Sequence, residues 1–249
     1  MKLTEVIAER PGKTIYRDGN YTIKLMNPEY SAADALNEAL NLAIVYETGF
    51  KVPSLHEVLK IDGRWAIVLE YIEGKSLHAL MQENPSMIDQ YFERFVDLQL
   101  FMHTHTAQRL HHHIDKMHGK ISQCGLDATT RYELHTRLSG LPKHNKLCHG
   151  DFTPGNVIIT PQDEAYVIDW SHATQGNASA DAARTYLQYK LAKFDDHAEK
   201  YLNMFCEKSD TAKQYVQKWL SIVAASQLVK KVPEERELLL NWANVVEYS

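Results

Sequence analysis

The sequence predicts an α+β fold in two parts: a small N-terminal antiparallel sheet with one helix, then a larger, mainly helical C-terminal region. Two observations carry this prediction. In the first third of the chain, alternating apolar residues flank tight-turn signals. Beyond residue 84, apolar residues recur with helical spacing, and short strands are expected only in the middle of that region. The change of character near Glu73-Gly74 separates the expected parts, 1–72 and 73–249.

Two hairpins are expected in the first part. The run from Tyr16 to Met26 alternates around Asp18-Gly19-Asn20, whose residue types favour a tight turn. A second turn is expected at Asp62-Gly63. The strand that follows it, from Trp65 to Tyr71, is apolar and β-branched enough to lie inside a sheet.

One helix is expected between the two hairpins. Ser31 with Asp34 resembles a capping box, in which each residue satisfies an N–H group of the other. Gly49 is a plausible stop, since glycine readily ends helices. Helical spacing predicts an apolar side at Leu36, Leu40 and Ile44.

The second part reads as helices around a few short strands. Asn84-Pro85 predicts the start of a long helix that runs to about Thr106, with proline at the first helical position. A further helix is expected over Asp127 to Ser139. Short strands are expected at Leu147-Cys148, Val157 to Thr160 and Ala165 to Ile168, and helices from Ser179 to Glu247, with breaks near Lys208-Ser209 and Pro233.

The composition excludes several classes of protein. The 249 residues are 44% hydrophobic and 24% charged, which suits a globular chain with its own core. A net charge of -5 without a long basic run argues against nucleic-acid binding. No stretch approaches the roughly 20 apolar residues that span a bilayer, and the N-terminus does not resemble a signal peptide. The three cysteines show no disulfide or zinc spacing, so we expect a cytoplasmic protein.

The segment from His149 to Asn156 carries the strongest functional signal. It is a loop between two short apolar strands, with a carboxylate at Asp151 and an amide oxygen five positions later. Asp169 ends the next apolar strand, so the three polar side chains could converge. A lone Asp and Asn at this spacing usually make turns only. The flanking strands, His149 and Asp169 favour a functional site instead.

These residue types suit phosphoryl transfer, which depends on positioning and on neutralising charge. Asp151 would orient an acceptor hydroxyl and take its proton. Asn156 and Asp169 offer the hard oxygen ligands that Mg²⁺ prefers, beside phosphate oxygens and water. The sequence therefore predicts a kinase that uses Mg²⁺ and a nucleotide triphosphate.

The same motifs resemble those of the aminoglycoside phosphotransferase and choline kinase family, which has a bilobal protein-kinase-like fold. His149-Gly150-Asp151 through Asn156 resembles the family's catalytic loop, and Ile168-Asp169-Trp170 its metal-binding strand end. The resemblance implies a scaffolding role for His149. It also implies that Asp181, at the start of the next helix, braces the catalytic loop.

The resemblance implies further nucleotide contacts in the first part. Lys24 matches the strand lysine that contacts phosphates, and Glu38 its helix partner. The segment around Glu70 and Ile72 is similar to the hinge that faces the purine, with Ile23 and Ile168 as candidate apolar contacts. The loop over the phosphates departs from the family pattern, because Glu9 to Thr14 holds a single glycine. Its candidate contacts are Gly12 and Thr14, and the choice between ATP and GTP stays open.

The expected acceptor is a hydroxyl of a small molecule. Asp169-Trp170-Ser171 replaces the Asp-Phe-Gly of protein kinases, and the short segment to Asp181 leaves no room for a peptide-docking loop. An aminoglycoside, an amino alcohol, a sugar and a nucleoside-like hydroxyl all remain open, as does the oligomeric state. Acidic residues that could face a polycation are Asp195, Asp196, Glu199 and Glu207. The alternatives are a nucleotide-binding module without useful turnover and, less favoured, a protein kinase.

Overall fold

The computed structural model describes residues 2–10 and 12–244, which form two compact units. The first unit takes 1–85 and 154–172, and the second takes 86–153 and 173–249. The chain therefore leaves the first unit after its sheet and returns to it for one short segment. The predicted division at residue 72, which concerns the role of each lobe, stays a prediction.

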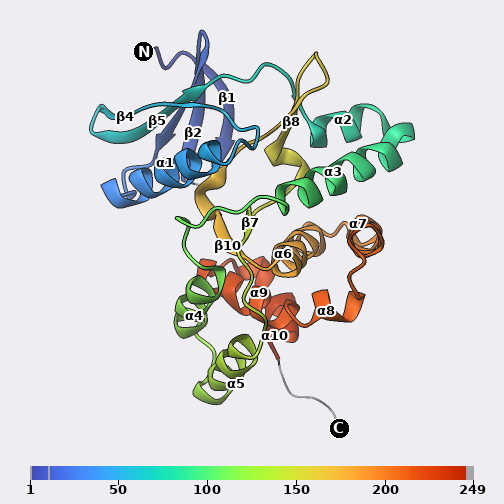
Figure 1. Cartoon of the computed structure of the whole chain (residues 1–249). Coiled ribbons are helices and arrows are strands. Elements are labelled where there is room, and N and C mark those ends of the chain that lie inside the picture. Colours follow the sequence, from blue (N-terminus) through green and yellow to red (C-terminus); the bar gives the residue numbers. More distant parts are fainter. Residues whose placement is uncertain (1, 11, 245–249) are drawn as a thin grey trace. The chain divides into compact units, whose positions relative to one another are not determined.

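A five-stranded antiparallel sheet forms the base of the first unit, in the order β1-β2-β3-β5-β4 (Figure 1). Both predicted hairpins are confirmed. Gly19 and Gly63 have positive φ angles of 60° and 80° in their turns, which glycine adopts without steric cost. The strands are β1 (Glu5–Arg10), β2 (Lys13–Asp18), β3 (Tyr21–Met26), β4 (Leu55–Ile61) and β5 (Arg64–Glu70).

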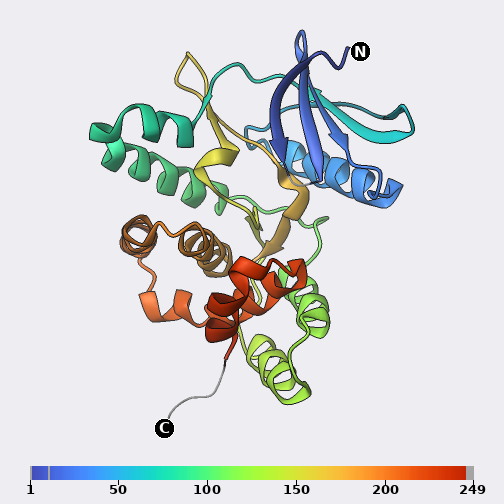
Figure 2. The same ribbon diagram turned by 180° about the vertical axis from the view of Figure 1, so that it is seen from behind.

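Helix α1 (Ala32–Glu47) packs on this sheet against β4 and β5 (Figures 1 and 2). The capping box is confirmed, because the Ser31 side chain accepts the Asp34 N–H while the Asp34 carboxylate accepts the Ser31 N–H. The predicted apolar side was wrong at Leu36 and Leu40, which are each 54% exposed. The helix instead buries a face that includes polar side chains, namely Ala35, Glu38, Ala39, Asn41, Leu42, Ile44 and Val45.

The rest of the first unit is a small layer that carries the returning segment. Strands β6 (Lys75–Ser76), β8 (Val157–Ile159) and β9 (Ala165–Val167) form an antiparallel sheet in the order β6-β8-β9. Helix α2 (Leu77–Glu83) follows β6, and short 3-10 helices cover Pro154–Asn156 and Trp170–His172. The Ile168 N–H donates to the Asn156 carbonyl at 2.9 Å, so the two ends of the returning segment are tied together.

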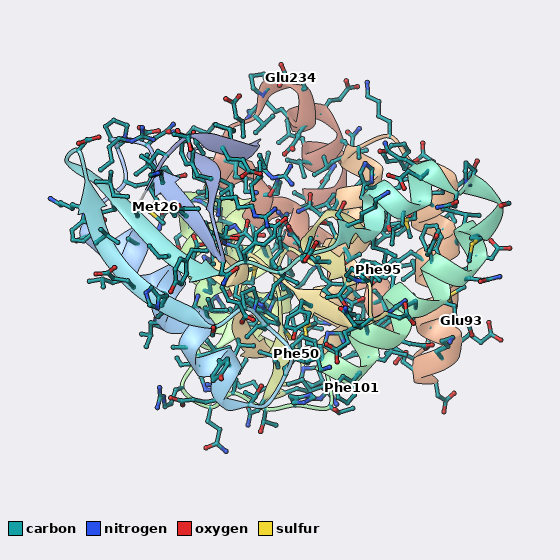
Figure 3. All side chains as sticks on the ribbon, turned by 90° about the horizontal axis from the view of Figure 1, so that it is seen from above. Met26, Phe50, Glu93, Phe95, Phe101 and Glu234 are labelled. Atoms are coloured by element: carbon teal, nitrogen blue, oxygen red, sulfur yellow. The ribbon has the colours of Figure 1, made fainter. Side chains whose placement is uncertain are left out.

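The second unit is a helical body with one two-stranded sheet. Phe95 points from α3 into its interior, as Figure 3 shows, and stacks on Phe152 with ring centroids 4.5 Å apart. Strand β7 (Lys146–Cys148) pairs with β10 (Thr174–Gly176). The helices are α3 (Ile88–Met102), α4 (His113–Gln123), α5 (Ala128–Ser139), α6 (Ala178–Leu191), α7 (Asp195–Ser209), α8 (Lys213–Gln217), α9 (Leu220–Gln227) and α10 (Arg236–Ala243).

The helical predictions need three corrections. Pro85 starts a 3-10 turn, and the long helix begins only at Ile88 and ends at Met102, before the predicted end near Thr106. Helices α2 and α4 were not predicted. The last helical region has a further break at residues 192–194, and its predicted end at Glu247 lies outside the described residues. Of the helices that the structure describes, none has the length and apolarity that crossing a bilayer requires.

Candidate active site

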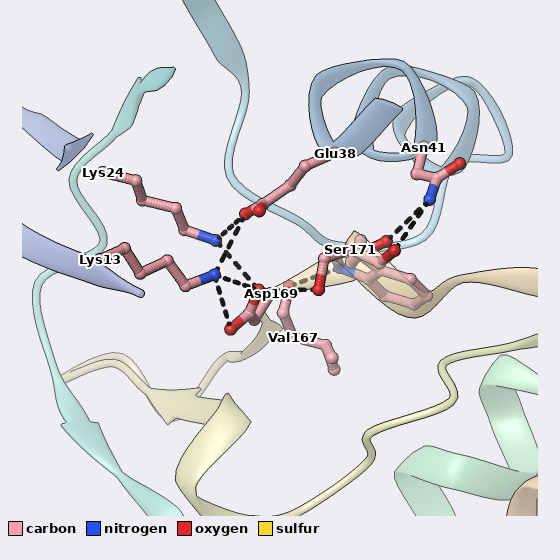
Figure 4. Close-up of polar contacts among 8 residues, drawn as sticks. Lys13, Lys24, Glu38, Asn41, Val167, Asp169 and Ser171 are labelled. Carbon is pink, nitrogen blue, oxygen red and sulfur yellow. Dashed lines mark hydrogen bonds and ion pairs between the residues drawn. The ribbon is translucent and has the colours of Figure 1, made fainter. Parts of the chain in front are cut away.

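A cluster of charged side chains lies between the sheet and α1 in the first unit (Figure 4). Lys24 Nζ on β3 is 2.6 Å from Glu38 Oε1 on α1, and 3.4 Å from Asp169 Oδ1 after β9. The predicted pair of Lys24 and Glu38 is thus present as a direct ion pair. Because Lys24 is only 6% exposed, this pairing replaces the hydration that its ammonium loses.

The alternation of β3 explains how a charged side chain reaches this position. Thr22 and Lys24 line one cavity, whereas Ile23 and Leu25 face the apolar core on the other side of the strand. Burial alone would lower the pKa of Lys24, but the carboxylates of Glu38 and Asp169 raise it overall. The ammonium therefore stays charged at the pH of the cell.

Lys13, at the start of β2, completes the cluster and was missed as a site residue in the sequence. Its Nζ lies 2.9 and 3.2 Å from the two carboxylate oxygens of Asp169, and 3.5 Å from Glu38 Oε1. Two lysines and two carboxylates therefore balance one another. The sequence did hold one indication of Lys13, because this residue directly follows Gly12 in the loop that was expected to cover the phosphates.

Asp169 is held in an uncommon backbone conformation. Its φ is 67°, in the left-handed region that non-glycine residues rarely adopt. The turn is fixed on both sides: the Trp170 indole N–H donates to the Val167 carbonyl at 2.9 Å, and the Asn41 amide donates to the Trp170 and Ser171 carbonyls (Figure 4). The polar face of α1 is thus explained, because Asn41 supports the turn that presents the carboxylate.

A cavity of about 320 Å³ opens on this cluster. Its walls include the predicted residues Glu70 and Ile72, and the predicted metal ligands Asn156 and Asp169. The remaining walls combine apolar and cationic side chains, among them Arg10, Lys13, Ile15, Pro53, Leu69 and Ile168.

Three candidates from the sequence lie elsewhere. Gly12 and Thr14 are not among the described residues that line the cavity. Gly12 has a φ of 83° and lies so close to Tyr30 that a Cβ would clash with its hydroxyl, which explains the glycine by packing. Pro11 of the same loop is outside the described residues. Ile23, a candidate apolar contact of the purine, instead faces the core. Ile15 and the other candidate, Ile168, line the cavity.

The donor set fits Mg²⁺. Asn156 and Asp169 contribute an amide and a carboxylate to the same cavity, and these hard oxygen donors are the ones that Mg²⁺ selects. The Asp169 side chain keeps 24% of its surface exposed, so its oxygens are reachable from the cavity. Lys13 and Lys24 supply its positive partners in this structure.

The catalytic-loop candidates lie in the second unit, where α6 holds them. The Gly150 N–H donates to Asp181 Oδ1 at 2.7 Å, and Gly150 has a φ of 77° that suits glycine. His149 is fully buried, and its Nδ1 accepts the Asp151 N–H at 3.1 Å. The predicted scaffolding contacts of His149 and Asp181 are therefore present.

Asp181 is itself bound from a second side. Its Oδ2 lies 3.0 Å from His103 Nε2 and 3.3 Å from the Gln99 amide. Burial alone would raise the pKa of Asp181, but the contacts with His103 and the Gly150 N–H hold it at about 2. The Asp181 carboxylate is therefore ionised at neutral pH.

Asp151 is oriented by a residue that the sequence did not suggest. Gln188, two turns after Asp181 on α6, donates its amide hydrogen to Asp151 Oδ1. Thr185 on the same helix donates to the Phe152 carbonyl at 2.9 Å. One helix face thus fixes Gly150, Asp151 and Phe152 in turn. A single sequence offered no signal for Gln188, since glutamine at this spacing is common on helix surfaces.

Comparisons with known proteins point to one family. A model of the phosphotransferase enzyme family matches residues 13–215. Among curated proteins, no relative matches. Among solved structures, the choline kinase LicA from Streptococcus pneumoniae is 17% identical and has a TM-score of 0.63, over 100% of this chain and 88% of that one.

Two aminoglycoside phosphotransferases are also similar. APH(3'')-Id from Streptomyces rimosus is 14% identical with a TM-score of 0.62, over 89% of this chain and 91% of that one. A thermostable mutant of APH(4)-Ia, solved with ADP and hygromycin B, is 13% identical with a TM-score of 0.68, over 96% of this chain and 89% of that one. At such identities the likeness shows the fold, and the predicted kinase-like α+β fold is confirmed.

Proposed function

Because the chain belongs to the phosphotransferase enzyme family, we propose that it transfers the γ-phosphate of ATP to a hydroxyl group of a small molecule, with GTP as the alternative donor. The predicted resemblance to aminoglycoside phosphotransferases and choline kinases is confirmed at the level of family and fold. The observation that carries the proposal is the joint presence of Lys24, Glu38, Asn156 and Asp169 around one cavity. The cytoplasmic location stays a prediction.

We assign the nucleotide to the cavity of the first unit. Lys24, held by Glu38, and Lys13 carry positive charge where the phosphates would lie. The Tyr71 N–H already donates to the Asn20 carbonyl at 2.8 Å, so we assign the purine edge to the backbone of Ile72. Apolar side chains such as Ile15, Leu69 and Ile168 would cover the ring.

We assign metal binding to Asn156 and Asp169. A bound Mg²⁺ would neutralise charge on the nucleotide phosphates. The chain's own lysines share this work, because Lys13 and Lys24 lie beside the same carboxylate. Lys13 also offers a substitute for the missing glycine-rich loop, since an ammonium binds phosphate oxygens that backbone N–H groups would otherwise bind.

Asp151 is the proposed base. As the acceptor oxygen bonds to the γ-phosphorus, the bond from that phosphorus to the bridging oxygen breaks, and the hydroxyl proton passes to the Asp151 carboxylate. The Gln188 amide donates a hydrogen bond to Asp151 Oδ1, and so orients the carboxylate. His149 and Asp181 are positioning residues, because they act through the loop backbone.

The alternatives have less support. The segment from Asp169 to α6 is occupied by the 3-10 helix Trp170–His172 and by β10, which leaves no extended loop for docking a peptide. A binding module without turnover was suggested by the poor phosphate loop. The place of Lys13 beside Asp169 weakens that argument, because the first unit has a second phosphate-binding cation.

The test is nucleotide consumption with a panel of hydroxyl compounds. We expect Asp151→Asn to lower the acceptor-dependent rate by about 10²–10⁴-fold, because general-base help is lost. Nucleotide binding, measured by calorimetry, should persist in this variant. Asp163→Asn, at an exposed turn, is the matched control and should retain full activity. Equal rates in Asp151→Asn and wild type would refute the proposal.

A further inference from the structure

Four cationic side chains of the second unit gather near Asp151. Lys116 and Lys120 lie one turn apart on α4, so they share a helix face. Arg184 lies on α6, and Lys230 ends the short 3-10 helix Leu228–Lys230 that follows α9. We call these four residues the basic cluster. Helices α4 and α6 both pack on α9, which brings the members together (Figures 1 and 2).

The spacing on α6 places Arg184 at the catalytic loop. Asp181, Arg184 and Gln188 follow at intervals of three and four residues, which puts them on one face of the helix. Asp181 contacts Gly150 and Gln188 contacts Asp151, so the face that carries Arg184 is the face that covers the loop. The guanidinium therefore lies beside the proposed base.

Arg184 is unusual in its burial. It is only 8% exposed, and among the described residues the carboxylates of Asp151, Glu235 and Asp181 act on it without a direct hydrogen bond or ion pair. A buried guanidinium that no direct hydrogen bond compensates is costly, and such groups are concentrated at functional sites. Lys120 likewise forms no hydrogen bond or ion pair within the part of the chain that the structure describes.

The electrostatic effects agree with this arrangement. Burial and the neighbouring Arg184 lower the pKa of Lys120 to about 7 and that of Lys116 to about 8. The carboxylates that oppose the cluster are chiefly Asp151 and Glu235. Glu235 also accepts a hydrogen bond from Gln227 at 2.7 Å. Asp181 acts on Arg184 as well, so three carboxylates oppose the charges of the cluster.

Other lysines of the second unit differ from the cluster. Lys208 Nζ is 3.0 Å from Glu93 and 2.6 Å from Asp97, and Lys213 is 2.8 Å from Glu199. Some of the acidic residues that could have faced a polycationic acceptor form ion pairs with lysines instead, since Asp195 pairs with Lys190.

We propose that the acceptor carries an anionic group, a carboxylate or a phosphate, which Arg184 and Lys120 bind while its hydroxyl lies at Asp151. The inference rests on the proposed phosphotransfer and narrows its substrate class. Arginine binds planar or tetrahedral oxyanions through two parallel N–H groups, and a lysine adds a compact charge. An amino alcohol or aminoglycoside would instead meet like charge at this position.

The experiment compares acceptors of one size that differ in charge. Glycerate, glycerol 3-phosphate, glycerol and 3-aminopropane-1,2-diol form one such set, and sugar acids, sugar phosphates, sugars and amino sugars form a larger one. We expect kcat/KM for the best anionic member to exceed that of its neutral counterpart by about 10–100-fold. The cationic members should be the poorest. Comparing carboxylates with phosphates identifies the anion.

Variants of Arg184 and Lys120 test whether these residues cause the preference for an anionic acceptor. Arg184→Gln and Lys120→Met should each raise KM for the anionic acceptor by about tenfold or more, with a smaller effect on kcat. Arg184→Lys should recover part of the loss. Lys120→Met keeps the test available if the arginine variants fold poorly. Lys208→Gln is the matched control, because its lysine is paired on the surface, and it should leave the kinetics unchanged.

The outcomes separate this inference from the proposed function. Preferential phosphorylation of a neutral or cationic acceptor would keep the phosphotransferase and overturn the anionic acceptor. Equal losses for charged and neutral acceptors in Lys120→Met and Arg184→Lys would also overturn it, because the residues would then only support the loop. Nucleotide binding without transfer to any acceptor class would overturn both.

Discussion

The two units both hold a group of cations, but the charges of the two groups are paired in different ways. In the first unit, Lys13 and Lys24 lie within 3.5 Å of Glu38 or Asp169. In the second, Arg184 and Lys120 have no such partner among the described residues. The first group thus has its counter-charges in direct contact, whereas the carboxylates that oppose Arg184 and Lys120 form no direct ion pair with them among the described residues.

This difference indicates how each group of cations would bind its ligand. In the first unit, the internal carboxylates keep the lysines extended toward the cavity, so the phosphates would meet preorganised donors. In the second unit, the cost of gathering like charges remains until an anion binds. Stability should therefore respond in opposite directions when a charge is removed from each group.

The largest effect is expected from Glu38→Gln. It leaves the buried Lys24 ammonium with Asp169 alone, and breaking a buried ion pair costs about 3–5 kcal/mol. Urea unfolding should show this loss, and the rise in Tm with ATP and Mg²⁺ should disappear. Glu57→Gln, on an exposed position of β4, is the control. A Glu38→Gln protein as stable as the control would contradict the view that the first group is neutralised from within.

Whether the sequence predicted a feature of the fold or the site depends on how far apart in the chain the interacting residues lie. The hairpins and the capping box of α1 depend on neighbouring residues, so the turn residues and Ser31 were enough to predict them. Asp151, Asn156 and Asp169 followed from polar residues at the ends of short apolar strands, and Lys24 from the resemblance to the family. The hairpins and the cap were predictable because their physical cause lies within a few positions of the chain.

The features that the sequence did not reveal depend on distant contacts. Lys13 meets Asp169 across 156 positions, and Gln188 meets Asp151 across 37. Leu36 and Leu40 were misassigned because α1 turns a polar face, with Glu38 and Asn41, toward the site. The basic cluster joins two helices and a later 3-10 turn, so no local pattern could have predicted it.

A smaller effect is expected from the carboxylate beside the basic cluster. The pKa of Asp181 is about 2, below its ordinary 3.8, so its contribution to stability is present above pH 3.8 and is lost as pH falls toward 2. The shift corresponds to about 2 kcal/mol. Urea unfolding of Asp181→Asn should show this loss at pH 7 and less of it at pH 3.

The control for this measurement is Asp196→Asn at an exposed position of α7. The result tests the comparison between the two groups of cations, because the ionised Asp181 contacts His103 and accepts the Gly150 N–H. If Asp181→Asn matches the control at neutral pH, the carboxylate is not committed to the loop. More of its charge would then act on Arg184, on which it already acts, and the contrast between the two units would weaken.

The smallest effect has the opposite sign. Lys120 faces Arg184, Lys116, Lys230 and Asp151, and its pKa of about 7 means that the folded protein disfavours the charged form. Removing the charge in Lys120→Met should therefore raise the free energy of unfolding at pH 7, by about 1–3 kcal/mol. Because the unfolded lysine titrates at 10.5, the unfolded state binds more protons between pH 7 and 10.5.

The free energy of unfolding of the wild type should therefore rise between pH 7 and 10.5. The difference in stability between Lys120→Met and the wild type should shrink over this range and vanish at its upper end. Lys208→Met should show no such gain at pH 7, because Lys208 has the carboxylates of Glu93 and Asp97 beside it. Urea unfolding of the three proteins at pH 7 and 9.5 measures both effects. A loss of stability in Lys120→Met at pH 7 as large as that in Lys208→Met would mean that the second group already has its counter-charge, and that no anion is needed to supply it.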